Sequence, residues 1–174
     1  VSKAIFGISG DLALCILTTV KITRGDPNPI SADEIEAIYS RTHEEAQVQA
    51  FNQLMESTGN SDINIELITS SDVYTKLDGQ AIANLEGKTG QEIELALFSV
   101  YTPTFNTDIL QAIAKSARLK IDAFSFEMYS LVKSLKASKG NTFDGIILDM
   151  GSDITDVGIV FGGGIVSTKT LPIG

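Results

Sequence analysis

The stretch 145-GIILDMGSDITDVGIVFGGGIVSTKTLPIG-174 decides the fold class, because it contains three strand patterns separated by two turns. β-branched and other apolar residues dominate 146–148, 157–161 and 165–171. Short apolar runs of this kind, bounded by glycine-containing turns, are typical of antiparallel strands. The stretch therefore predicts a three-stranded ribbon.

The first turn of this ribbon combines an acidic strand end with a run of turn-forming residues. Asp149 ends the first strand pattern, and Gly151, Ser152 and Asp153 follow it. Backbone N–H groups in such a turn can hold a phosphate, and a carboxylate at the strand end can hold Mg²⁺ through water. From the residues alone an ordinary β-hairpin remains the alternative, because turns favour Asp, Gly and Ser anyway.

Residues 1–101 carry a different arrangement. Residues 2–20 read as one strand in which Gly7 and Gly10 allow a bend. A helix begins at Ser31, because Ser31 and Glu34 have the spacing of a capping box, and it ends at Gly59-Asn60. Alternating apolar residues then predict strands at 63–67 and 91–101. The expected result is a three-stranded sheet with one helix on it.

Residues 102–140 read as helix, strand and helix after Pro103 interrupts the strand pattern. The first helix, about 107–118, is expected to bury Ile109 and Ile113. A strand at 119–124 and a helix with Met128 and Val132 on its apolar side follow. The alternation of helices and strands places the chain in the α/β class.

Composition narrows the possible functions. The chain has 174 residues, 13 Lys and Arg against 22 Asp and Glu, and a formal net charge of -9. Such a chain repels phosphate backbones, so no nucleic-acid partner is expected. Its one cysteine, Cys15, excludes an internal disulfide and is expected to be a small core side chain. No apolar run approaches the roughly 20 residues that cross a bilayer.

The spacing of residues 7–11 does not fit the nucleophile motif of a serine hydrolase. Gly7-Ile8-Ser9-Gly10-Asp11 superficially resembles a nucleophile elbow, but its second glycine is displaced. The only histidine, His43, lies in a charged helical stretch and is expected to be solvated. The same helix is acidic, which indicates either a solvated face or a docking surface for a basic segment. Its acidic residues are Asp33, Glu34, Glu36, Glu44 and Glu45.

Residues 145–174 resemble the second phosphate-binding hairpin of the actin-like ATPases, D-x-G-G-G-T-T-D, and are most similar to that of the FtsA cell-division family. Residues 6–10 resemble the G-I-S-G strand that opens the 1C interaction subdomain of that family. Leu77-Asp78-Gly79 and the glycines of 87–92 resemble a later part of 1C, and 108–135 resemble the connecting helix–strand–helix. The order of these segments agrees with the family along the whole chain.

The resemblance implies a role for each residue of the first turn. Asp149 would face Mg²⁺, the amide of Gly151 would approach the phosphates, and Thr155 and Asp156 would occupy the closing T-D positions. Ser152 and Asp153 stand where the family prefers Gly, and Ile154 stands where it prefers Thr. The implied cofactor-binding set is Asp149, Gly151, Ser152, Asp153, Ile154, Thr155 and Asp156.

The resemblance also implies a domain organisation. Residues 1–101 would be an α+β interaction subdomain of the 1C type, and 102–140 the connecting part of the actin-like core. Residues 141–174 would begin a ribonuclease-H-like nucleotide-binding subdomain. The first phosphate hairpin and the adenine-binding part would lie outside this chain, so the fragment alone is expected not to hydrolyse ATP.

Two functions follow as expectations. The first is a filament scaffold in bacterial cell division, whose full-length parent binds ATP and Mg²⁺, self-associates and tethers FtsZ. That parent would be cytoplasmic, at the inner face of the cell membrane, held there by a C-terminal amphipathic helix. The alternative is a relative of the type IV pilus assembly ATPase PilM. The G-I-S-G strand favours the first.

Overall fold

Four antiparallel strands form the largest sheet of the computed structural model, which describes residues 2–25, 28–139 and 142–174. The order across the sheet is β2–β5–β3–β4, with bounds β2 Leu14–Thr23, β5 Glu92–Pro103, β3 Ile65–Leu77 and β4 Gln80–Ala81. The short β4 follows Asp78 and Gly79, whose φ angles of 49° and 79° form a tight two-residue hairpin turn. The sheet expected to have three strands therefore has a fourth.

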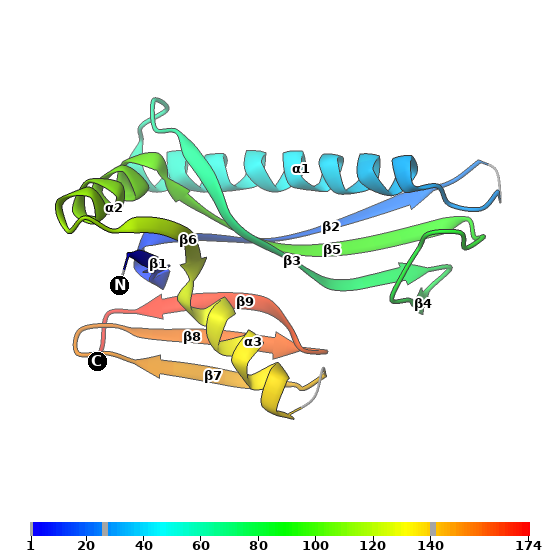
Figure 1. Ribbon diagram of the computed structural model, residues 1–174. Coiled ribbons are helices and arrows are strands. Elements are labelled where there is room, and N and C mark those ends of the chain that lie inside the picture. The colour runs from blue at the N-terminus through cyan, green and yellow to red at the C-terminus, as the bar shows by residue number, and fades with distance from the viewer. Residues whose placement is uncertain (1, 26–27, 140–141) are drawn as a thin grey trace.

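Helix α1 (Ala32–Thr58) lies along one face of this sheet (Figure 1). Its start and end are as predicted: the Ser31 hydroxyl accepts a hydrogen bond from the Glu34 N–H at 3.2 Å, and Gly59 ends the helix with φ 67°. Its buried residues recur at every fourth position, which gives one narrow stripe toward the sheet. They are Ile38, Thr42, Ala46, Ala50 and Leu54.

Strand β5 is the centre of the molecule because both of its faces are buried. Leu95 and Leu97 pack with Ile38 in the core under α1. Phe98 and Val100 point to the opposite face and belong to a second core. The predicted alternation of Leu95 and Leu97 is confirmed, and the second buried face explains why the strand is apolar almost throughout.

Strand β1 (Lys3–Ile8) lies outside this sheet and pairs in parallel with β6 (Lys120–Phe126). The expectation of one strand over residues 2–20 is therefore wrong. A short 3₁₀ turn, Gly10–Leu12, separates β1 from β2, and β2 belongs to a different sheet. Helices α2 (Thr104–Ser116) and α3 (Glu127–Lys139) flank β6 in the chain.

The C-terminal stretch forms the predicted three-stranded antiparallel sheet. Its order is β7 (Gly145–Met150), β8 (Thr155–Phe161) and β9 (Gly164–Leu171). This sheet and α3 lie on the side of the large sheet opposite α1 (Figure 1). Val160 and Ile165 pack with Phe98 of β5 and Phe126 of β6, so one apolar core joins all three sheets.

Two expectations about exposure are wrong. Ile109 and Ile113 of α2 are 56% and 51% exposed, because the helix contacts β5 and β6 through its other side, where Thr107 and Ala114 are buried. His43 is half-buried rather than solvated, and its Nε2 lies 2.9 Å from the Ser70 hydroxyl of β3. None of the helices in the described ranges is both long and apolar enough to span a membrane.

Candidate functional site

The turn between β7 and β8 is closed by a backbone hydrogen bond from the Gly151 N–H to the Ile154 carbonyl, 2.9 Å. Ser152 and Asp153 lie at its exposed tip, where the Ser152 hydroxyl donates to the Asp153 carboxylate at 2.9 Å. Within the described residues, the backbone N–H groups of Ser152 and Asp153 have no acceptor. These two N–H groups could donate to an anion at this tip. The backbone of Gly174 packs against the Ser152–Asp153 peptide, since a Cβ atom on Gly174 would lie 2.6 Å from the Asp153 nitrogen.

Thr155 and Asp156 make contacts inside the protein. The Thr155 side chain is buried and its hydroxyl donates to the Ile173 carbonyl at 2.7 Å. The Asp156 carboxylate accepts from the Gly10 N–H at 3.1 Å and from the Thr170 hydroxyl. These two residues hold the base of the turn against the chain end and against the 3₁₀ turn after β1.

Asp149 lies at the edge of a cavity of about 440 Å³ between β1, α3 and β7. Glu127, the first residue of α3, lines the same cavity. A Cβ atom on Gly7 would lie 2.7 Å from the Glu127 carboxylate, so a side chain at position 7 would require the Glu127 side chain to move. Gly7 thus leaves the space that the Glu127 carboxylate occupies beside the cavity that it shares with Asp149.

Several carboxylates lie around Glu127. Burial raises the pKa of Glu127, and three further carboxylates raise it too: those of Asp149, Asp156 and Asp11. Repulsion of this kind is relieved by a proton or by a cation. Burial and the neighbouring carboxylates therefore favour the neutral, protonated form of Glu127.

The side chains at this site supply too few ligands for an octahedral cation, so waters and a bound phosphate would have to supply the others. Among the described residues, no group of three or more His, Cys, Asp and Glu side chains is arranged to hold a metal ion. Mg²⁺ commonly uses one or two carboxylates, several waters and substrate phosphates. The exposed Asp149 carboxylate beside the amides of the turn matches that pattern.

The structure places only some of the predicted site residues in the turn itself. Gly151, Ser152 and Asp153 form the turn, with Asp149 two residues before it, as the sequence indicated. Ile154 is half-buried and contributes its carbonyl to the turn. Glu127 was missed because it is distant in the chain, and the only signal for it was Gly7, which was interpreted as a bend.

Comparison with known proteins places the fold. No protein-family model and no curated protein sequence matches the chain. A solved structure of the "PilM-PilN type IV pilus biogenesis complex" matches with a TM-score of 0.52 and 11% sequence identity. The match covers 91% of this chain and 40% of that chain, so the chain spans less than half the length of its structural neighbour.

This likeness shows that the chain shares its fold with part of that structure. The expected α/β class is therefore confirmed. The match gives no support to the narrower resemblance to the FtsA family, because the neighbour belongs to a pilus complex. The alternative relationship named from the sequence, to PilM, agrees better with it.

Proposed function

We propose that the chain is the interaction and phosphate-hairpin part of an actin-like assembly protein of the PilM type. The observation that carries the proposal is the PilM–PilN match over 91% of the chain, which requires both the large sheet and the hairpin sheet to correspond. The protein would serve as a scaffold that binds partner proteins rather than as an independent enzyme.

The hairpin turn would supply one half of a nucleotide clamp in the full-length parent. The free amides of Ser152 and Asp153 would donate to ATP phosphates, and Asp149 would hold Mg²⁺ through water. Mg²⁺ supplies charge neutralisation for the phosphates when bound. Thr155 and Asp156 would position the turn through their contacts with Ile173, Gly10 and Thr170.

The nucleotide part of this proposal is tested by titrating the full-length parent with Mg-ATP in a calorimeter. Asp149→Asn is expected to weaken Mg²⁺-dependent ATP binding about tenfold, the loss expected for one charge-assisted contact. Asp108→Asn is the matched control, because Asp108 is an exposed carboxylate on α2, far from the turn in the chain. Equal binding by wild type and Asp149→Asn would contradict the assigned role.

The partner part is tested separately. The full-length parent, immobilised, is expected to capture a PilN homologue from the same genome and not FtsZ. The large sheet is the expected contact region, because strand edges and helix faces are common peptide-docking elements. Capture of FtsZ without PilN would reverse the assignment.

The second candidate is a division scaffold of the FtsA type. The observation that favours it is the G-I-S-G strand, whose last glycine contacts the hairpin residue Asp156. In that case the parent would self-associate into filaments, tether FtsZ and bind the membrane through a C-terminal amphipathic helix. Vesicle binding by the full-length parent that is lost on deletion of such a helix would support this candidate.

A further inference from the structure

A second cavity, of about 300 Å³, lies between β3, α3 and the turn that joins β8 to β9. It is separate from the β7–β8 turn, because the two turns are at opposite ends of the seven-residue strand β8. At the usual rise per residue this corresponds to about 20 Å. The cavity is therefore outside the candidate nucleotide site.

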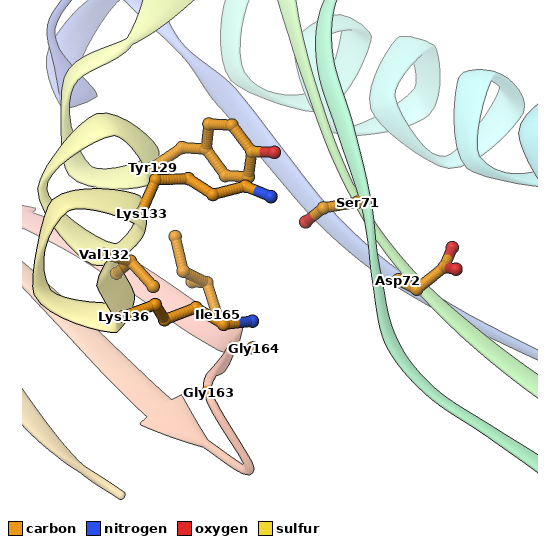
Figure 2. A pocket seen from close by; sticks show the side chains of 9 residues that line it. All are labelled: Ser71, Asp72, Tyr129, Val132, Lys133, Lys136, Gly163, Gly164 and Ile165. Atoms are coloured by element: carbon orange, nitrogen blue, oxygen red, sulfur yellow. The ribbon is translucent and has the colours of Figure 1, made fainter. Parts of the chain in front are cut away.

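Four polar groups converge on this cavity (Figure 2). Lys133 and Lys136, one turn apart on α3, both extend their ammonium groups toward it. The Tyr129 hydroxyl points the same way, and the Ser71 hydroxyl faces them from β3. All four groups can donate hydrogen bonds.

The two ammonium groups have no anionic partner in the protein. Within residues 2–25, 28–139 and 142–174, neither Lys133 nor Lys136 forms an ion pair, although the Lys133 Nζ lies 5.3 Å from the centre of the Tyr129 ring. Asp72 also lines the cavity, but its carboxylate points away from the lysines in Figure 2 and accepts from the Tyr39 hydroxyl at 2.8 Å.

The shape of the cavity depends on close backbone packing. A Cβ atom on Gly164 would lie 3.0 Å from the Cα atom of Val73, so a glycine there allows β9 to approach β3. The lysines and Ser71 thereby face each other across a gap of limited size.

We propose that this cavity binds a phosphate monoester. A phosphate monoester is close to a dianion at neutral pH and has three strong acceptor oxygens, which match two ammonium charges and the hydroxyls of Ser71 and Tyr129. The lysine ammonium group is a compact point charge that can bind a phosphate from any direction. It does not need the planar, two-pronged geometry with which arginine binds a carboxylate. The proposal goes beyond the proposed function and does not depend on it.

The test is an NMR titration of the ¹⁵N-labelled chain, in which the amide signals of Ser71, Gly163 and Gly164 are followed. The probes are O-phosphoserine, inorganic phosphate and glutarate, each at constant ionic strength. O-phosphoserine is expected to give saturable shifts and the tightest binding. Tighter binding of free phosphate would overturn the assignment to an ester, and equal binding of glutarate would overturn the preference for phosphate.

Variants separate a built site from general charge. Lys133→Gln with Lys136→Gln is expected to weaken O-phosphoserine binding more than about tenfold, since two charge-assisted contacts are lost. Lys115→Gln with Lys120→Gln removes the same charge from exposed positions on α2 and β6 and is expected to bind like wild type. Equal weakening in both double variants would overturn the proposal. Ser71→Ala removes a hydroxyl donor and leaves the charge unchanged, so it is a second test, and it is expected to weaken O-phosphoserine binding measurably.

Discussion

The carboxylate of Asp156 accepts a hydrogen bond from the backbone N–H of Gly10 at 3.1 Å, across 146 positions of sequence. The same carboxylate accepts from the Thr170 hydroxyl on the neighbouring strand β9. The 3₁₀ turn after β1 is thereby attached to the middle of the hairpin sheet. Glycine is needed at position 10, because a Cβ atom there would overlap both the Asp156 carboxylate and the Thr170 hydroxyl.

Gly10→Ala is expected to lower the free energy of unfolding by about 1–3 kcal/mol, the usual cost of forcing a side chain into a packed site. Urea denaturation followed by circular dichroism measures it. Gly145→Ala is the matched control, because a Cβ atom on Gly145 would meet nothing within 4 Å. Equal stability of the two variants would show that the Gly10–Asp156 contact tolerates a methyl group.

Arg24→Ala is expected to lower the free energy of unfolding by about 1–3 kcal/mol, between the values for exposed and for buried ion pairs. The Arg24 guanidinium donates to the two carboxylate oxygens of Glu34 at 2.6 and 3.0 Å and to the Gly90 carbonyl at 2.8 Å. The Arg24 side chain is only 8% exposed, whereas the Glu34 side chain is 33% exposed, so truncation leaves the Gly90 carbonyl without this donor and the Glu34 carboxylate with water as its remaining partner.

The control for Arg24 is Arg41→Ala. Arg41 pairs with Glu45 on the surface of α1, and both side chains are well exposed. A surface pair of this spacing contributes about 0.5 kcal/mol or less. A loss at Arg41 as large as that at Arg24 would contradict the role given to burial.

The unfolding free energy is expected to fall as the pH rises from 9 toward 11, in part because of Cys15. Burial raises the pKa of the Cys15 thiol from 9.0 to about 11. The folded state therefore keeps its proton where the unfolded state loses it, so this contribution is complete below pH 9.0 and is lost toward about pH 11. Cys15→Ala should flatten this part of the stability profile.

Tyr39 acts in an overlapping pH range and must be separated from Cys15. Burial, together with its hydrogen bond to Asp72, raises the pKa of Tyr39 from 10.0 to about 12. Tyr39→Phe is therefore measured beside Cys15→Ala, and each variant should remove its own portion of the alkaline decrease. An unchanged profile in Cys15→Ala would contradict the burial of the thiol.

Acid is expected to destabilise the protein through Glu94. Hydrogen bonds from Tyr74, Lys21 and Lys76 lower the pKa of the Glu94 carboxyl from 4.5 to about 2. The stabilisation is present above pH 4.5 and is lost as the pH falls toward about 2, because the unfolded state takes up the proton first. Glu94→Gln should reduce this dependence in urea denaturation measured across that range, whereas Glu92→Gln on the same strand serves as the control.

Local signals in the sequence predicted well wherever the deciding contact is close in the chain. The Ser31 cap, the Gly59 helix end and the alternation around Leu95 each depend on neighbours within a few residues. The failures depend on distant contacts. Residues 2–20 form two strands because β6, more than a hundred residues later, provides a partner for β1.

The candidate site shows the same division. The β7–β8 turn could be located from Gly151, Ser152 and Asp153 alone. The supporting roles of Thr155 and Asp156 could not be predicted from the sequence, because only folding brings their partners Ile173 and Gly10 near. The cavity beside α3 carried a weak signal in Lys133 and Lys136, which share a helix face, but the facing Ser71 comes from another sheet.

The apolar core that Phe98 shares with Phe126 and Val160 has a mechanical consequence. A hinge motion between the α1-covered sheet and the hairpin sheet would have to separate these buried side chains. We therefore expect the α1-covered sheet and the hairpin sheet to move together as one rigid body.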